Sequence, residues 1–509
     1  MKKGLILGLL LAAMFLWTGG SASAESKGSI KLGVPAEPST FDPHRITGFT
    51  MNMHFPLVFD NLVFRDNSGK IIPKLAKSWK LVKPTVLQFK LREGLKFTNG
   101  EPVDAHAVKF SLERILDPKL KSRQYGYFRG MDHVEVVDKY TVNVHTKYPD
   151  MFLLSPLTSY GNIVPPKYYK SKPLKYLARH PVGSGPYKLV KWSKGEEMVY
   201  EANPNYWDPS KNQIKKGTFK IIPEPTTRVS ALLAGDVDIV YSVSPQLTQM
   251  VSSRPKVEVV AGDSVRTCYI ILTIKKDSPW ADVRVRKALN LAIDKKSIIK
   301  NVLQGNARIV ATNVGPTSFG HNPNLKPFPY DPVKAKKLLA EAGYPNGFSV
   351  DMYVPLGRYL MGKQTAEAIA GQFAKVGIKA RVGTPEWGKL VKIMRPRWEA
   401  HSKPFWWYGC RMDMHLHAEG MFAGTIHSKS TWGGFRDKGV DKLTTDARSE
   451  PDDAKRQKKY ENILKILRHD KVPLVFLWQN NQIHAKKKSV NWKLRPNAVM
   501  LLSEMSWKK

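Results

Sequence analysis

Two neighbouring stretches, Tyr269–Ile274 (YIILTI) and Asp282–Ala292 (DVRVRKALNLA), decide the fold class of this chain. The first is a short, continuous apolar run, which is typical of a strand buried on both faces of a sheet. The second begins with an aspartate suited to cap a helix. Its apolar side chains recur at the spacing of one helix face: Val285, Ala288, Leu289 and Ala292. A buried strand followed by an amphipathic helix indicates an α/β fold.

The same alternation of strands and helices extends along the rest of the chain. Helical stripes or caps mark the segments 331–343, 369–377 and 460–467. The pattern of Val86–Arg92 alternates as a strand does, Val134–Val144 predicts a hairpin, and Val472–Trp478 is a second buried run. No repeat of fixed period and no biased linker interrupts this pattern. The sequence therefore predicts partly buried sheets interleaved with helices throughout.

The first residues indicate export from the cytoplasm. Met1–Lys3 is a short basic segment, Gly4–Trp17 is apolar, and Ala22-Ser23-Ala24 has the small-residue pattern of a signal-peptidase site. The apolar stretch is shorter than the ~20 residues that cross a bilayer. No cysteine lies near the cleavage site to accept a lipid. We therefore expect a signal peptide at residues 1–24 and a mature protein that is periplasmic and not lipid-anchored.

Composition bounds the function classes. The chain has 509 residues, a 42% hydrophobic content that can fill several cores, and a net charge of +38. Its length suggests about three domains. Nucleic-acid binding does not fit, because the basic residues are spread along the chain without a recognition motif and the protein is exported. Two readings of the charge remain, a solvated basic surface or a field that attracts acidic solutes.

Catalytic signatures are missing from the sequence. Gly183-Ser184-Gly185-Pro186 is neither a nucleophile elbow nor a phosphate loop and reads as a turn. His415 and His417, if they lie on a strand, share one face as a metal-ligand pair would; the alternative is a pair of hydrogen-bonded or surface histidines. We expect no enzyme and no cofactor. Cys268 and Cys410 are the only cysteines, which favours one disulfide in an oxidising compartment.

Several motifs together resemble a known family. They occur in one order along almost the whole mature chain: Glu37–Pro43, Leu91–Pro102, Pro181–Tyr187, Asn203–Trp207, Asp282–Asp294, Tyr330–Pro332 and Glu341–Pro345. This set is similar to the motifs of the family 5 extracytoplasmic solute-binding proteins of ABC importers, which take up oligopeptides, dipeptides and nickel. The oligopeptide-binding members are the nearest in pattern.

This resemblance implies a periplasmic-binding-protein-like α/β fold, in which two lobes close over a cleft and a third lobe is inserted. The implied boundaries are 25–64, 182–266 and 485–509 for lobe I, 65–181 for lobe II and 267–484 for lobe III. Chain crossings near 266–268 and near 484 would form the hinge.

The resemblance also implies a function. The protein would capture a peptide or peptide-like solute and deliver it to a permease in the inner membrane, acting as a monomer without nucleic acid. One alternative is a binder of nickel chelates or metallophores, with His415, His417 or His427 as contacts. Another is an envelope hydrolase or a peptide-holding chaperone.

Candidate ligand contacts follow from the same resemblance. In the oligopeptide binders a disulfide precedes an aspartate that holds the α-ammonium of the peptide; here that implies a Cys268–Cys410 bond and Asp413. The alternative for Asp413 is a loop residue that caps backbone amides. Trp387 resembles a pocket tryptophan, with Arg395 as partner of the peptide carboxylate. Three adjacent aromatics, Trp406, Trp407 and Tyr408, line either the pocket or the core.

Overall fold

The computed structural model describes residues 28–394, 404–430, 432–497 and 499–508. The signal-peptide prediction for residues 1–24 and the ligand prediction for Arg395 fall outside these residues. Among the described residues, no helix is both long and apolar enough to cross a bilayer.

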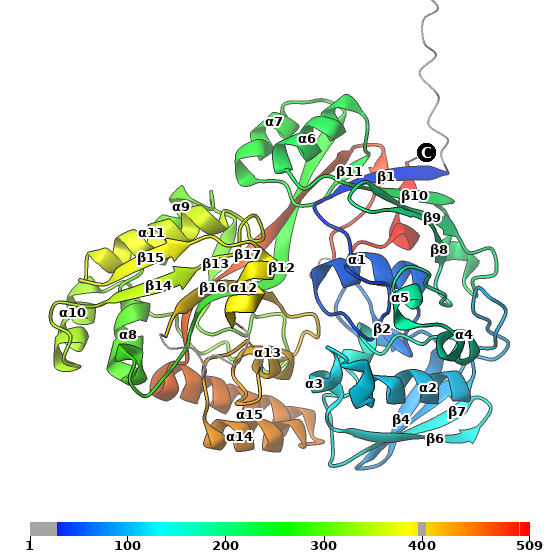
Figure 1. The fold of residues 1–509 in the computed structure, drawn as a ribbon, viewed down its shortest axis with the longest axis horizontal. Coiled ribbons are helices and arrows are strands. Elements are labelled where there is room, and N and C mark those ends of the chain that lie inside the picture. The colour runs from blue at the N-terminus through cyan, green and yellow to red at the C-terminus, as the bar shows by residue number, and fades with distance from the viewer. Residues whose placement is uncertain (1–27, 395–403, 431, 498, 509) are drawn as a thin grey trace, which may run out of the picture.

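An eleven-stranded mixed sheet forms the framework of the molecule (Figure 1). Its strands follow the order β15-β14-β16-β12-β17-β11-β1-β10-β9-β8, and β13 pairs with β17. Their bounds are β1 (Ser29–Val34), β8 (Tyr187–Ser193), β9 (Glu197–Ala202), β10 (Lys216–Ile221), β11 (Ile239–Val240), β12 (Val257–Leu272), β13 (Ala307–Ile309), β14 (Ser349–Tyr353), β15 (Lys379–Gly383), β16 (Trp406–Met412) and β17 (Leu474–Lys487). Strands and helices thus alternate in one α/β fold, as predicted.

Residues 65–181 contribute a separate antiparallel sheet with the order β4-β5-β7-β6. The strands are β4 (Ala76–Lys83), β5 (Val86–Leu91), β6 (Met131–Asp138) and β7 (Thr141–Thr146). The hairpin predicted at 134–144 is confirmed as β6 and β7, and the alternating stretch from Val86 is confirmed as β5. Two short strand pairs complete the β structure: β2 (Val63–Arg65) with β3 (Ile71–Pro73), and β18 (Val490–Asn491) with β19 (Ser506–Trp507).

Helices cover these sheets (Figure 1). They are α1 (Phe49–Val58), α2 (Ala105–Leu116), α3 (Tyr125–Phe128), α4 (Pro166–Ser171), α5 (Leu174–Leu177), α6 (Pro225–Ala234), α7 (Thr248–Ser252), α8 (Val283–Leu291), α9 (Lys295–Asn301), α10 (Pro332–Glu341), α11 (Gly362–Ala374), α12 (Trp387–Met394), α13 (Ala418–Thr425), α14 (Lys438–Arg448) and α15 (Asp453–Ile466). The predicted caps are confirmed, because Asp282 accepts a hydrogen bond from the Arg284 amide and Asp331 accepts one from the Lys334 amide.

Two long strands connect the parts of the molecule. β12 and β17 pair antiparallel from Val257 opposite Lys487 to Ile271 opposite Leu474. The apolar run 269–274 therefore covers only the last residues of β12, and the run 472–478 covers only the first residues of β17. The crossings predicted near 266–268 and 484 lie within these two strands. The division into three lobes stays a prediction, and the lobe names below denote the residue ranges given above.

Both faces of the sheet in lobe III are buried. Cys268, Ile270 and Leu272 enter one hydrophobic cluster, which contains α8 and α11 side chains. Tyr269 and Ile271 enter another, on the side of α13 and α15. Cys268 lies opposite Cys410 on β16, and the two sulfurs are bonded. This strand pair fixes the position of the loop that follows β16.

Candidate functional site

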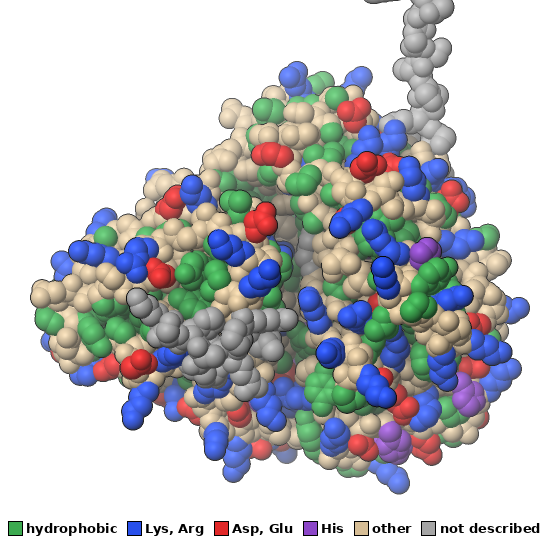
Figure 2. Space-filling model, viewed as in Figure 1, with side chains coloured by type: hydrophobic (Ala, Val, Ile, Leu, Met, Phe, Trp, Pro, Cys, Tyr) green, Lys and Arg blue, Asp and Glu red, His purple; other side chains and the backbone are tan. Residues whose placement is uncertain are grey.

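A groove separates lobe III from lobes I and II on the face shown in Figure 2. The side chain of Arg411, next to the disulfide on β16, reaches toward the opposite lobe. Arg411 lies opposite Thr267 of β12, on the same face as Trp407 and Tyr269. Its Nη2 donates a hydrogen bond to the hydroxyl oxygen of Tyr127 on α3. The contact joins lobe III to lobe II.

A glycine makes room for this arginine. A Cβ atom on Gly424 of α13 would lie 2.2 Å from Cζ of Arg411, so a larger residue there would displace the guanidinium. The Nε atom of Arg411 is buried without a hydrogen-bond partner, although the side chain as a whole is only partly buried. The guanidinium therefore keeps unused donors at the contact between Arg411 and Tyr127.

Aromatic side chains surround Arg411. The rings of Tyr127 and Tyr160 are 5.1 Å apart, and both lie about equally close to the ring of His415, at 4.7 and 5.0 Å. Tyr269 is fully buried on the neighbouring strand. Burial raises the pKa of Tyr160 and of Tyr269, so both hydroxyls stay neutral. These tyrosines offer hydrogen bonds without any negative charge.

Two further arginines lie near the same strands. Arg266 of β12 is partly buried, and its Nη2 contacts the sulfur of Met412 at 3.0 Å. Desolvation lowers the pKa of Arg266 while the guanidinium remains charged. The exposed Arg358 lies 3.9 Å from the ring centre of Trp387, whose ring stacks on Trp432 at 5.6 Å. Within the described part of the chain, no carboxylate forms an ion pair with Arg266, Arg358 or Arg411.

Asp413, the predicted ammonium contact, is only 3% exposed. Its Oδ2 accepts hydrogen bonds from the Ser318 hydroxyl at 2.5 Å and from the His417 amide at 3.0 Å. Burial raises its pKa to about 6. This placement matches the alternative held from the sequence, a carboxylate that organises the loop between β16 and α13. Its role as a ligand contact stays a prediction.

His415 and His417 do not lie on a strand, which corrects the geometry assumed for a metal-ligand pair. The chain leaves β16 at Met412 and turns through Leu416, where φ is +48°, before α13 begins. His417 caps that helix, because its Nδ1 accepts the Glu419 amide hydrogen at 3.1 Å. Burial lowers the pKa of both imidazoles well below the usual value. Among the described residues, no group of three or more His, Cys, Asp or Glu side chains could hold a metal ion.

The predicted aromatic residues separate into two environments. Trp406 is 0% exposed and packs on Trp280 at 5.0 Å and Phe373 at 5.5 Å, within the core. Tyr408 shares that core. Trp407 faces the other cluster, where Trp387 and Trp432 pack beside it. Trp387 begins α12 and is half-buried. Alternation along β16 therefore places Trp406 and Tyr408 in one cluster and Trp407 in the other, against which Trp387 of α12 packs.

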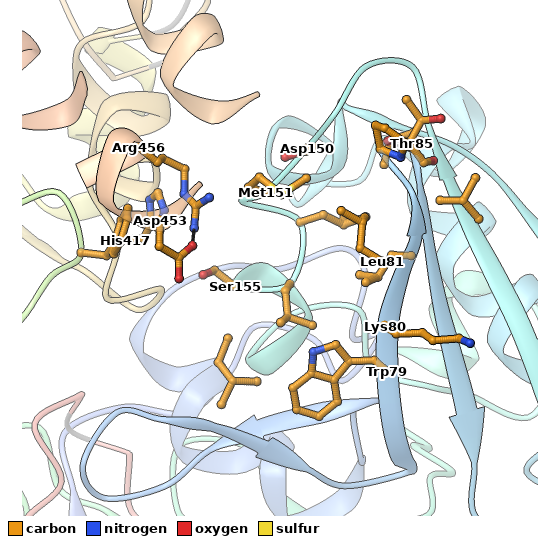
Figure 3. Close-up of a pocket in the computed structure, with 18 of the residues that line it drawn as sticks. Trp79, Lys80, Leu81, Thr85, Asp150, Met151, Ser155, His417, Asp453 and Arg456 are labelled. Carbon is orange, nitrogen blue, oxygen red and sulfur yellow. Dashed lines mark hydrogen bonds and ion pairs between the residues drawn. The ribbon is translucent and has the colours of Figure 1, made fainter. Parts of the chain in front are cut away.

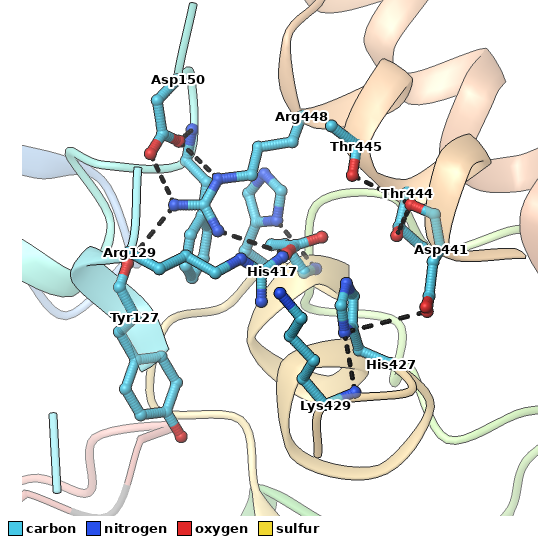
Figure 4. A network of polar contacts seen from close by, with 12 residues as sticks. Tyr127, Arg129, Asp150, His417, His427, Lys429, Asp441, Thr444, Thr445 and Arg448 are labelled. Carbon is cyan, nitrogen blue, oxygen red and sulfur yellow. Dashed lines mark hydrogen bonds and ion pairs between the residues drawn. The ribbon is translucent and has the colours of Figure 1, made fainter. Parts of the chain in front are cut away.

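A buried ion-pair network also joins lobes II and III (Figure 4). Arg448, at the end of α14, contacts both carboxylate oxygens of Asp150, with Nε–Oδ1 and Nη2–Oδ2 distances of 2.6 and 2.5 Å. Its Nη1 lies 3.3 Å from Oε1 of Glu419, which also pairs with Arg129 at 3.1 Å. The side chains of Arg448 and Asp150 are fully buried. The pairs of Arg448 with Asp150 and of Glu419 with Arg129 therefore join the two lobes, whereas the pair of Arg448 with Glu419 lies within lobe III.

A cavity of about 480 Å³ adjoins this network between β4–β5 and α15, and Asp150 forms part of its lining. Figure 3 shows His417 and Arg456 on one side of it and Trp79 and Leu81 on the other. Its charged wall is already internally paired, since Arg456 bonds to Asp453.

Sequence reasoning missed Arg411, Arg266 and Tyr127. The only local signal for Arg411 is its place between Cys410 and Asp413, at the end of the strand that the disulfide holds. Nothing local marks Tyr127, which is 284 residues away from its partner.

Known structures share the fold of this chain. Two solved structures superpose over 95% of the chain: the AgaA periplasmic binding protein of A. tumefaciens R10 in complex with agropinic acid (26% identity, TM-score 0.83, 99% of that chain), and DppA of Helicobacter pylori in complex with the peptide STSA (25% identity, TM-score 0.84, 98% of that chain). The chain therefore has the fold of the periplasmic binding proteins.

Sequence comparison gives the family. Residues 70–422 match the profile of the bacterial extracellular solute-binding proteins, family 5. Heme-binding protein A of Haemophilus influenzae is 30% identical over 483 residues, which cover 89% of this chain and 87% of that protein. Glutathione-binding protein GsiB of Escherichia coli K12 is 27% identical over 403 residues, covering 79% and 77%. The chain belongs to the bacterial extracellular solute-binding proteins, family 5, as its motifs indicated.

Proposed function

We propose that this protein is the periplasmic solute-binding component of an ABC importer, which captures a peptide or peptide-like solute in the groove and delivers it to the inner-membrane permease. The observation that carries the proposal is the hydrogen bond from Arg411 to Tyr127, which crosses between lobes beside unused donors and aromatic rings. A solute bound there would contact both lobes at once.

Closure of the lobes would couple capture to delivery. A ligand that contacts both lobes favours the closed arrangement over the open one. The pairs formed by Arg448 with Asp150 and by Glu419 with Arg129 couple the lobes, because opening would separate each pair, although hydration of the freed charges offsets part of the lost attraction. The proposed hinge lies where β12 and β17 cross between lobes I and III, near 266–268 and 484.

The remaining parts of the proposal are the signal peptide at 1–24, a monomeric mature chain and the lack of catalysis. They rest on the basic, apolar and small-residue segments at the start of the sequence and on membership of a family of binding proteins. A hydrolase would convert its bound solute, whereas an importer component releases it intact.

The test uses mature protein exported with its own leader. Melting temperature and small-angle scattering would be recorded with dipeptides, tripeptides, glutathione, haem and nickel–histidine, and each solute would be recovered and weighed. We expect the peptide-like solutes of this set to raise the melting temperature of the protein and to reduce its radius of gyration. We also expect these solutes to be recovered unchanged. At 100-fold excess over Kd the stabilisation is about 2.7 kcal/mol. A panel that changes neither quantity, or a solute recovered as products, contradicts the proposal.

A further inference from the structure

We propose that Arg411 is the anchor for a carboxylate of the solute, so that the protein selects acidic peptide-like solutes through their negative charge. This inference rests on the proposed function, because it names the chemistry of the same groove.

Arg411 has hydrogen-bonding capacity that the described residues do not use. A guanidinium carries five N–H donors, and here the described residues accept only one hydrogen bond, at the hydroxyl of Tyr127. The Nε atom is buried without a partner. A desolvated cation without a counter-ion is costly, and a carboxylate that accepts two parallel N–H bonds offsets that cost.

The groups around the guanidinium supply no counter-ion. Burial raises the pKa of Tyr160 and Tyr269, so these two are neutral, and the neutral ring of His415 lies beside Tyr127 and Tyr160. None of these groups supplies the missing negative charge. The guanidinium packs directly against Gly424 of α13, where no side chain displaces it.

Asp413 is almost fully buried, and the Ser318 hydroxyl and the His417 amide both bond to its Oδ2, while its Oδ1 has no hydrogen-bond partner among the described residues. Two further cations, Arg266 on β12 and Arg358 before α11, lie near the same strands. Within the described part of the chain neither of them, nor Arg411, is paired with a carboxylate, so a solute that reaches them meets positive charge. An acid fits this field and a free amine does not.

The experiment compares three forms of one tripeptide library: free acid, C-terminal amide and N-acetylated acid. Calorimetric titration would be carried out on the parent protein and on Arg411→Met, Arg411→Lys and Arg381→Met. Arg381 is an exposed arginine of β15 that pairs with Asp351, and it serves as the matched control. Glutathione and its diethyl ester form a second acid and neutral pair.

We expect the acid and the N-acetylated acid to bind the parent protein equally, and the amide and the ester to bind at least tenfold more weakly. Arg411→Met should abolish this preference for acids. Arg411→Lys should retain part of it, because the charge stays while the two-donor fork is lost. Arg381→Met should bind as the parent does.

Two results would overturn the assignment. One is equal binding of acid and amide forms by the parent protein; the other is an unchanged acid preference in Arg411→Met. A melting measurement without solute guards against a folding defect. If Arg411 is a solute anchor, Arg411→Met melts no lower than the parent; a structural role lowers its melting temperature. If the parent protein binds only neutral or cationic solutes, the role of Arg411 is wrong and the importer function is unaffected. If the parent protein binds no solute and does not close, both the role of Arg411 and the importer function are wrong.

Discussion

Arg448 of α14 donates two hydrogen bonds, of 2.5 and 2.6 Å, to the carboxylate of Asp150 in lobe II, and both side chains are fully buried. The pair lies at the junction of two segments that are 298 residues apart in sequence. It therefore reports on whether lobes II and III are together.

This pair gives a first prediction. Arg448→Met leaves the Asp150 carboxylate buried without its cation and should cost about 3 to 5 kcal/mol of closed-state stability. Asp150→Asn should cost less, because Arg448 keeps its pair with Glu419. The double variant should recover much of that loss, because no unpaired charge remains at this position. The measurement is a double-mutant cycle on solute affinity, with scattering to record closure. Additive losses would show that the two residues act independently.

The second prediction concerns the bond between Cys268 and Cys410. Thiol titration of unfolded, unreduced protein should detect no free thiol. Reduction should lower the melting temperature, since the bond closes a loop with a sequence separation of 142 residues, for which chain entropy allows up to about 5 kcal/mol. Detection of two thiols per chain in the exported protein would refute the pairing.

The third prediction uses the pKa of Asp413, which burial raises to about 6 from 3.8. Because the folded state holds the proton more tightly than the unfolded state, this group stabilises the fold at low pH. That contribution is lost as the pH rises from about 4 to 6 and amounts to about 3 kcal/mol. In Asp413→Asn the loss should be absent. Unfolding free energies of both proteins between pH 3.5 and 7 provide the check, and parallel curves would contradict it.

The same variant separates two roles of Asp413. If the carboxylate only accepts hydrogen bonds from Ser318 and the His417 amide, the asparagine oxygen can replace it and solute affinity stays within about twofold, a difference of about 0.4 kcal/mol. If it binds an ammonium, affinity falls and N-acetylated peptides bind the parent poorly.

Two tryptophans form a matched pair for the fourth prediction. Trp406→Ala should lower the free energy of unfolding by about 3 to 5 kcal/mol, because the ring is fully enclosed by Trp280, Phe373 and their neighbours. Trp387→Ala should instead weaken solute binding about tenfold, or about 1.4 kcal/mol, with a smaller effect on unfolding. Denaturant unfolding and calorimetry on both variants distinguish them. The reverse pattern would place the groove on the other face of β16.

The parts of the fold that could be predicted are those encoded locally. Asp282 and Asp331 predict the starts of α8 and α10, because in each case the capping side chain and the apolar stripe of the helix lie within one short segment. The hairpin of β6 and β7 is local in the same way. The disulfide followed from the count of cysteines and the family pattern.

The site could not be predicted to the same extent. Arg411 is recognisable as a candidate only through its hydrogen bond to Tyr127, and folding alone brings these two residues together. Alternation along β16 assigns Trp406 and Trp407 to opposite faces, but both faces are buried, so the pattern alone could not tell core from groove. The strand assumed for His415 and His417 ends at Met412, because the loop turns at Leu416 to start α13.

Mass spectrometry of the solute that the exported protein releases on unfolding tests the central claim most directly. The parent protein should release one small solute per chain that carries at least one carboxylate, and Arg411→Met prepared in parallel should release little of it. A neutral or cationic solute, or an equal yield of the same acid from Arg411→Met, would contradict the account.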